Sequence, residues 1–190
     1  MILAVVAGLA MGSFPTADLL ARTRRIDLRR SGSGNPGTAN ALRVGGVGLA
    51  LAVLGLDLAK GAGAALTGAA MGGDRTAVAA SLAAVAGQVL NPWFRFRGGK
   101  GLGVAAGTGL VIWPQGLLIT LVVTGAGARV AGSATGALAG LGALSVAATP
   151  WVANAWPTAW GVAPEAALAW YAVGVAGLTA PKFVRSLLRR

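Results

Sequence analysis

Two glycine-rich segments hold most of the polar residues that could take part in chemistry. The first glycine segment, Gly32-Ser33-Gly34-Asn35-Pro36-Gly37-Thr38-Ala39-Asn40, lies between two apolar stretches and is flanked by arginines. Glycine tolerates the backbone conformations that turn successive N–H groups toward one point, which makes an anion-binding concavity. The second glycine segment, Arg97-Gly98-Gly99-Lys100-Gly101, adds a lysine. Together they predict a site that handles phosphate groups.

The composition restricts the chemistry of that site. The chain contains no cysteine and no histidine. Disulfides, thiol nucleophiles, thiolate metal sites, Ser-His-Asp triads and His-ligated zinc are therefore excluded. Any reaction must use Ser, Thr, Asn, Asp, Lys, Arg and backbone amides, and we expect neither a metal nor a cofactor.

One familiar nucleotide motif is matched by spacing alone. Gly32, Gly34 and Gly37 fit the pattern G-x-G-x-x-G, and Asp57 follows at the distance that a dinucleotide-binding fold would require. No strand is predicted before Gly32, and Asp57 lies within an apolar stretch. A dinucleotide site is therefore rejected.

The elements that must position the glycine segments are membrane helices. Of the 190 residues, 55% are hydrophobic and 11% are charged, and the mean hydropathy is +0.71. These values predict an all-α integral membrane protein, which we treat as a single domain over residues 1–190. The net charge of +11 does not indicate nucleic-acid binding, because the basic residues cluster beside the apolar stretches, as membrane topology requires.

Seven apolar stretches are candidates for transmembrane helices. They run roughly over residues 2–20, 44–71, 77–93, 101–113, 115–128, 131–148 and 164–180. Glycine is frequent in them, and Gly136 and Gly140 form a small-xxx-small pair that would allow close helix packing.

The basic residues predict the orientation. Fourteen of the 16 lie between spans one and two, three and four, and five and six, and after span seven: Arg22, Arg24, Arg25, Arg29, Arg30, Arg43, Arg95, Arg97, Lys100, Arg129, Lys182, Arg185, Arg189 and Arg190. Arg75 falls between spans two and three, and Lys60 lies inside span two. With seven spans the fourteen share one side, so the positive-inside rule predicts an N-terminus outside and a cytoplasmic C-terminus. Both glycine segments then face the cytoplasm at the plasma membrane. Trp151, Trp156 and Trp160 are expected on the opposite face as an interfacial aromatic belt.

Glycine-rich loops also occur as flexible connectors, with arginines that serve only topology. A shaped site is favoured here because polar side chains occur among the glycines of both segments: Ser33, Asn35, Thr38, Asn40, Arg43 and Lys100. Asp57 and Lys60 are spaced i, i+3 in the second span and are expected to pair. Whether that pair is structural or functional stays open.

Four motifs carry a family resemblance. They are Gly12-Ser13-Phe14-Pro15, the segment from Gly32 to Arg43, Leu56-Asp57-Leu58-Ala59-Lys60-Gly61 and Phe96-Arg97-Gly98-Gly99-Lys100-Gly101. In order and spacing the chain resembles the bacterial acyl-phosphate:glycerol-3-phosphate acyltransferases, the PlsY family. The resemblance implies seven transmembrane helices and a site on the cytoplasmic side. It also implies transfer of a fatty acyl group from acyl phosphate to the 1-hydroxyl of glycerol 3-phosphate, which gives lysophosphatidic acid for phospholipid synthesis.

The resemblance implies roles for particular residues. Ser33, Asn35 and Lys100 are the expected catalytic residues, and Lys100 and Arg43 would hold glycerol phosphate as cationic clamps. Asn40 would order the first segment. The substrate-binding set is Gly32, Gly34, Gly37, Thr38, Asn40, Arg43, Arg97, Gly98 and Gly99, and the possible supporting set is Ser13, Asp57 and Lys60. A substrate phosphate, with a pKa of about 6, would take the hydroxyl proton. The expected partners are the two substrates and membrane lipid.

The chain departs from the family pattern in two motif regions. It reads Gly87-Gln88-Val89-Leu90-Asn91 where the family has Gly-His-x-Phe-Pro, and Ala180-Pro181-Lys182-Phe183 where the family has His-Arg-x-Asn. A second hypothesis is therefore a catalytically impaired paralogue that binds anionic lipid precursors or regulates an intact acyltransferase. A transporter of phosphorylated solutes has no support from an inverted repeat.

Overall fold

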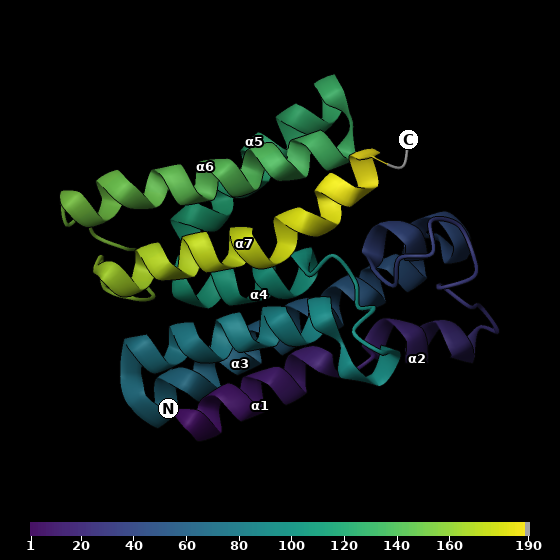
Figure 1. Ribbon diagram of the computed structural model, residues 1–190, viewed down its shortest axis with the longest axis horizontal. Coiled ribbons are helices and arrows are strands. Elements are labelled where there is room, and N and C mark those ends of the chain that lie inside the picture. The colour runs from purple at the N-terminus through teal and green to yellow at the C-terminus, as the bar shows by residue number, and fades with distance from the viewer. Residues whose placement is uncertain (189–190) are drawn as a thin grey trace.

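The computed structural model describes residues 1–188, and within that range it contains helices and no strand. The elements, in order, are α1 (Ile2–Ser13), α2 (Thr16–Thr23), α3 (Thr38–Leu90), the 3₁₀ helix η1 (Pro92–Phe94), α4 (Leu102–Ile112), α5 (Pro114–Ala131), α6 (Ser133–Ala153) and α7 (Ala166–Leu188). They form a bundle of roughly parallel and antiparallel helices (Figure 1). Arg189 and Arg190 of the predicted basic tail lie outside the described residues.

The 53 residues of α3 do not form one rod. At 1.5 Å per residue a straight helix of that length would measure about 80 Å, far more than a bilayer core. The chain reverses at Gly72 and Gly73, which have non-helical backbone angles, and Gly73 has a φ of 69° that favours glycine. A Cβ on Gly68 would lie only 2.6 Å from the Thr76 carbonyl oxygen. Gly46, with a φ of 75°, interrupts the helix a first time. Residues 47–71 and 74–90 are therefore the two arms of a tight hairpin, and they correspond to the second and third predicted spans.

The helix predicted over residues 2–20 is interrupted after Ser13. Pro15 has no N–H to donate, and its ring disfavours a helical conformation in the residue before it. Phe14 accordingly has an extended ψ of 125°. The chain resumes as α2, which places Asp18 on a separate short helix.

By length and composition, five helical stretches within residues 1–188 can cross a membrane: Ile2–Thr23, Thr38–Phe94, Pro114–Ala131, Ser133–Ala153 and Ala166–Leu188. The hairpin of α3 lies within the second of these, and α4 is a shorter apolar helix. Several apolar helices in one chain identify a multi-pass membrane protein.

Glycines let the helices approach backbone to backbone. A Cβ on Gly12 would overlap the carbonyl oxygen of Ala84, and one on Gly136 would lie 2.5 Å from that of Thr124. These close approaches join α1 to the second arm of α3, and α6 to α5. The face predicted for Gly136 and Gly140 is therefore a helix contact.

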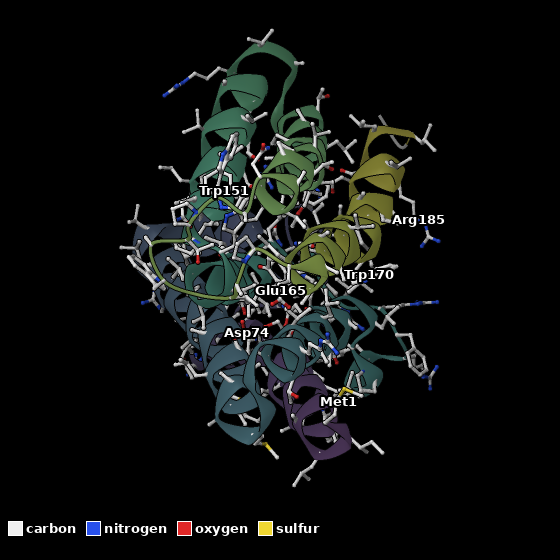
Figure 2. All side chains as sticks on the ribbon, turned by 90° about the vertical axis from the view of Figure 1, so that its left-hand side faces the viewer. Met1, Asp74, Trp151, Glu165, Trp170 and Arg185 are labelled. Atoms are coloured by element: carbon white, nitrogen blue, oxygen red, sulfur yellow. The ribbon has the colours of Figure 1, made fainter. Side chains whose placement is uncertain are left out.

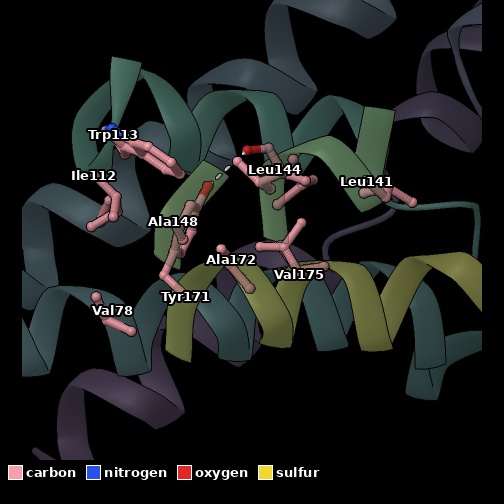
Figure 3. Packing of buried hydrophobic residues seen from close by; sticks show 14 of the residues in the cluster. Val78, Ile112, Trp113, Leu141, Leu144, Ala148, Tyr171, Ala172 and Val175 are labelled. Atoms are coloured by element: carbon pink, nitrogen blue, oxygen red, sulfur yellow. Dashed lines mark hydrogen bonds between the residues drawn. The ribbon is translucent and has the colours of Figure 1, made fainter. Parts of the chain in front are cut away.

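Two groups of buried apolar side chains hold the bundle. The larger, shown in Figure 3, includes Trp113, Leu144 and Tyr171, and the Tyr171 hydroxyl lies 2.8 Å from that of Thr108. The smaller joins α2, the following loop and the start of α3 through Ala17, Ala21, Leu28, Ala41, Leu49, Ala50 and Val53. This smaller group fixes the first glycine segment against the bundle.

The bundle has two contrasting ends. Both glycine segments and the C-terminal part of α7 lie at one, which we call the glycine end (Figure 1). The α3 reversal and the loop between α6 and α7 lie at the other, with Trp113, Trp151, Trp156 and Trp160, which we call the tryptophan end. Figure 2 views the molecule from this side, with Asp74, Trp151 and Glu165 labelled.

Candidate active site

The first glycine segment is shaped by Asn40. This side chain is 1% exposed, and its Oδ1 accepts a hydrogen bond of 2.8 Å from the Ser33 N–H. Its Nδ2 donates to the carbonyl oxygens of Leu28 at 2.9 Å and Ser31 at 3.0 Å. A Cβ on Gly32, whose φ is 60°, would overlap Asn40 Oδ1. Both polar atoms of the carboxamide make hydrogen bonds to the surrounding backbone, so Asn40 holds the shape of the segment.

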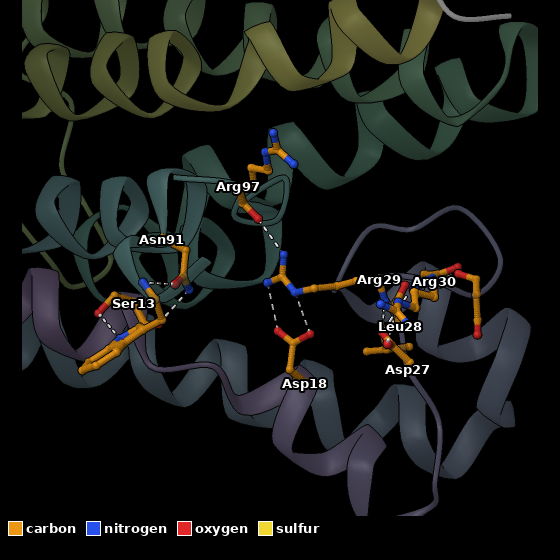
Figure 4. Close-up of polar contacts among 11 residues, drawn as sticks. Ser13, Asp18, Asp27, Leu28, Arg29, Arg30, Asn91 and Arg97 are labelled. Atoms are coloured by element: carbon orange, nitrogen blue, oxygen red, sulfur yellow. Dashed lines mark hydrogen bonds and ion pairs between the residues drawn. The ribbon is translucent and has the colours of Figure 1, made fainter. Parts of the chain in front are cut away.

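Arg29 joins three separate parts of the chain (Figure 4). Its Nε lies 2.9 Å from Asp18 Oδ1 and its second terminal nitrogen lies 3.0 Å from Oδ2, which makes a two-pronged ion pair. Its first terminal nitrogen donates to the Arg97 carbonyl oxygen at 2.7 Å. The guanidinium also lies 3.5 Å from the centre of the Phe94 ring. Such planar, forked contacts are specific to arginine, and they link α2 and the loop after it to the turn before the second glycine segment.

The two glycine segments meet. A Cβ built on Gly99 would lie 3.2 Å from the Pro36 carbonyl oxygen and 3.9 Å from Asn35 Oδ1. On its other side the second segment packs on the end of α3, where a Cβ on Gly98 would overlap the Gln88 carbonyl oxygen. Lys182 Nζ of α7 donates to the Gly98 carbonyl oxygen at 3.1 Å. The glycines thus allow two distant loops to pack on one another.

Lys100 is held against α7. Its Nζ donates to Ser186 Oγ at 3.4 Å and lies 4.4 Å from the centre of the Phe183 ring. A cation over the face of an aromatic ring is attracted by the quadrupole of that ring. The lysine is half-buried, at the same end of the bundle as Asn35.

The other residues predicted for the site lie at or near the surface of the glycine end. Ser33, Gly34, Arg43 and Arg97 are exposed, whereas Asn35, Gly37, Thr38 and Gly98 are half-buried. The structure therefore brings Asn35, Gly98 and Gly99 together, and it leaves Ser33 and the two arginines open to solvent.

A buried polar network lies beneath the glycine segments. Lys60 Nζ lies 2.9 Å from Asp57 Oδ1, and the two residues are 9% and 4% exposed. The same ammonium donates to Gln88 Oε1 at 2.9 Å and to the Phe14 carbonyl oxygen at 3.2 Å. Thr16 Oγ1 donates to Asp57 Oδ1 at 3.3 Å. The pairing predicted for Asp57 and Lys60 is present, and it extends across three helical segments.

Ser13 ties α1 to the turn that precedes the second glycine segment. Its carbonyl oxygen accepts a hydrogen bond of 2.7 Å from Asn91 Nδ2, and its hydroxyl accepts one of 3.3 Å from Trp93 Nε1 (Figure 4). Asn91 Oδ1 in turn caps η1 by accepting from the Trp93 N–H at 3.1 Å. Ser13 therefore supports this turn through both its carbonyl oxygen and its hydroxyl group.

Sequence reasoning missed Asp18, Arg29 and Gln88. Asp18 is the one charged residue in the apolar stretch 2–20, a signal that could have marked it. For Arg29 the sequence indicates only a role in membrane topology. For Gln88 it indicates only a departure from a family motif, and no pattern in the sequence places its amide between Lys60 and Gly99.

A family model described as glycerol-3-phosphate acyltransferase matches residues 2–183. The chain belongs to this family. It is 42% identical over 123 residues to a glycerol-3-phosphate acyltransferase of Rhodopseudomonas palustris strain BisB5, a match that covers 64% of this chain and 63% of that relative. It is 39% identical over 151 residues to one of Cereibacter sphaeroides strain ATCC 17029, with 78% of this chain and 72% of that relative covered.

The match to a Rubrobacter xylanophilus family member is 41% identical over 114 residues and covers 57% of that relative. For this relative and the Rhodopseudomonas one, the aligned part is therefore less than two thirds of the relative's length. A crystal structure of PlsY (YgiH), an integral membrane glycerol 3-phosphate acyltransferase in its glycerol 3-phosphate form, matches with a TM-score of 0.83 and 23% identity. That match covers 100% of this chain and 90% of the other, and it shows that the two proteins share a fold.

Proposed function

We propose that this protein transfers a fatty acyl group from acyl phosphate to the 1-hydroxyl of glycerol 3-phosphate, making lysophosphatidic acid for phospholipid synthesis. The observation that carries the proposal is the meeting of the two glycine segments, where Gly99 packs beside Pro36 and Asn35. Transfer between two phosphate-bearing substrates requires two anion-binding elements at close range. Membership of the glycerol-3-phosphate acyltransferase family supports the substrate class.

Each segment has a task in the proposed reaction. Backbone N–H groups of residues 32–38, with Ser33 and Asn35, hold the phosphate of the acyl donor. Lys100 and Arg43 hold the phosphate of glycerol 3-phosphate, and the backbone of residues 97–99 forms the wall between the two anions. The flexible stem of Lys100 lets its ammonium move from Ser186 to a substrate oxygen.

The proposed reaction needs no reactant other than the two substrates. The 1-hydroxyl oxygen bonds to the acyl carbonyl carbon, and the bond between that carbon and the phosphate oxygen breaks. Inorganic phosphate leaves and takes the hydroxyl proton, because its pKa of about 6 suits it to accept one. The proposal uses no metal and no cofactor.

The proposed topology has seven spans in one transmembrane domain over residues 1–190, with the N-terminus outside. The two arms of α3 supply the second and third spans, and α4 supplies the fourth. The glycine end then faces the cytoplasm at the plasma membrane, in keeping with its arginines and lysines. Soluble substrates would reach the site from that side.

A catalytically impaired paralogue is the second candidate, and Gln88 is the observation that favours it. A carboxamide does not titrate in the physiological range, so this residue cannot serve as a general base. In that case the same site would bind anionic lipid precursors, or regulate an intact acyltransferase, without turnover.

The deciding experiment supplies purified protein in detergent with labelled glycerol 3-phosphate and palmitoyl phosphate. We expect labelled lysophosphatidic acid and inorganic phosphate in equal amounts, and no product when palmitoyl-CoA replaces palmitoyl phosphate. Heat-denatured protein is the matched control. Binding of labelled glycerol 3-phosphate without product would contradict the proposal and support the paralogue.

A further inference from the structure

The buried side chain of Gln88 has a fixed orientation. Its Oε1 accepts a hydrogen bond of 2.9 Å from Lys60 Nζ. An ammonium group has only donors, so the amide oxygen must face it and the amide nitrogen must face away. Lys60 is itself held by Asp57 at 2.9 Å and by the Phe14 carbonyl oxygen at 3.2 Å. The direction of the Gln88 amide is therefore set by a charged pair that lies deeper in the bundle.

The amide nitrogen faces the place where the two glycine segments meet. Gln88 Nε2 lies 3.4 Å from a Cβ built on Gly99, and the same point lies 3.9 Å from Asn35 Oδ1. Within residues 1–188, no hydrogen bond of the structure uses Nε2 as its donor. Gln88 is only 7% exposed, and a donor left unpaired at such a position costs stability unless water or a ligand accepts from it.

We propose that Gln88 is a catalytic residue whose amide N–H donates to the acyl carbonyl oxygen as negative charge develops there, and that Lys60 is the positioning residue that aims it. This inference rests on the proposed function. The bond-forming oxygen of glycerol 3-phosphate pushes the carbonyl π electrons onto that oxygen, and departure of phosphate returns them. A donor already fixed in place stabilises that charge without reorganising.

The depth of Gln88 matches the carbonyl of an amphiphilic donor. The phosphate of acyl phosphate belongs with the polar glycine segments, and its hydrocarbon chain belongs with the apolar bundle. The carbonyl joins the two. Gln88 stands near the end of α3, directly under Gly99, so its nitrogen lies at the boundary between the two environments.

The experiment compares Gln88→Leu with Gln115→Leu, which removes the other glutamine of the chain. Gln115 lies at the start of α5, and its Oε1 is buried without a hydrogen-bond partner among residues 1–188. We expect Gln88→Leu to lower kcat by about 100-fold to 1000-fold while the KM for glycerol 3-phosphate is unchanged, because the contact forms only in the transition state. Gln115→Leu should keep the wild-type kcat.

A double-mutant cycle tests the positioning role. The paired change Asp57→Leu with Lys60→Met removes both charges at once, which avoids an unpaired buried ion. It should lower kcat about tenfold in the wild-type background. In the Gln88→Leu background it should have almost no further effect, because there is no amide left to aim.

Three results would overturn the inference. The first is a Gln88→Leu variant that keeps the wild-type kcat. The second is a loss of rate matched by an equal loss of folded protein, measured by thermal unfolding in detergent. The third is a full tenfold effect of the paired change in the Gln88→Leu background. If the wild-type protein transfers no acyl group from any acyl phosphate, the proposed function fails, and this inference fails with it.

Discussion

The glycine end and the tryptophan end close the same bundle in different ways. At the tryptophan end the ring centres of Trp113 and Trp151, and of Trp151 and Trp156, are each 5.4 Å apart in edge-on contacts. Trp113 is fully buried, and Trp160 Nε1 donates to the Leu110 carbonyl oxygen at 2.7 Å. Large rings therefore supply much of the apolar contact area at this end.

At the glycine end the contacts are made by backbone and by charged groups. Arg29 reaches Asp18 and the Arg97 carbonyl oxygen, and Lys182 reaches that of Gly98. Backbone N–H groups without a bulky side chain can serve an anion. The comparison predicts that the tryptophan end governs stability and the glycine end governs ligand binding, so substitutions at the two ends should have separable effects.

The largest effect is expected for Lys100→Met. Removal of the cation that is proposed to contact a substrate phosphate should lower kcat/KM by about 100-fold or more. Ser186→Ala is the matched control, because it removes one hydrogen-bond partner of Lys100 and leaves the charge. The measurement is transfer of label from glycerol 3-phosphate into lipid. Undiminished turnover of Lys100→Met would reject the role given to this lysine.

Gly98→Ala should have the next largest effect. The added Cβ would overlap the Gln88 carbonyl oxygen and lie 2.7 Å from that of Val89, so the second glycine segment must move away from α3. A displacement of about 1 Å at the site can cost about 100-fold in rate. Gly142→Ala in α6 is the control, since a Cβ there has no atom within 4 Å. Equal rates for both variants would show that the close packing at Gly98 is unimportant for catalysis.

A smaller effect is expected for Arg29→Lys. Lysine keeps the charge but cannot make the two-pronged contact with Asp18 while also reaching the Arg97 carbonyl oxygen. The link between α2 and the second glycine segment should loosen, and kcat/KM should fall about tenfold, as for other residues that orient the groups of a site without touching the substrate. Arg30→Lys is the control, because Arg30 is exposed and its carboxylate partner, Asp27, is 3.8 Å away. A wild-type rate for Arg29→Lys would show that the ion pair between Arg29 and Asp18 does not affect catalysis.

The smallest effect on activity is expected at the other end. Trp151→Leu removes both edge-on ring contacts, each worth about 1 kcal/mol. The unfolding temperature in detergent should fall by a few degrees, while kcat and KM stay at the wild-type values. A clear loss of kcat in folded Trp151→Leu would contradict the prediction that the tryptophan end affects stability and not activity.

Much of the architecture could be predicted from the sequence. The apolar stretches 44–71 and 77–93 were separated at the position where Gly72 and Gly73 reverse α3. The helix over 2–20 was less accurate, because Pro15 breaks a stretch whose hydropathy is continuous. The pairing of Asp57 with Lys60 followed from their i, i+3 spacing.

The sequence by itself determined the membrane class, the position of the glycine segments and the chemistry excluded by the absence of histidine and cysteine. Those properties depend on residue type and on neighbours within a few positions. Only the tertiary structure decided that Arg29 would reach the Arg97 carbonyl oxygen, 68 positions away, and that the Gln88 amide would face Gly99. Such meetings depend on how helices far apart in the chain pack together, and no local pattern of residues encodes that packing.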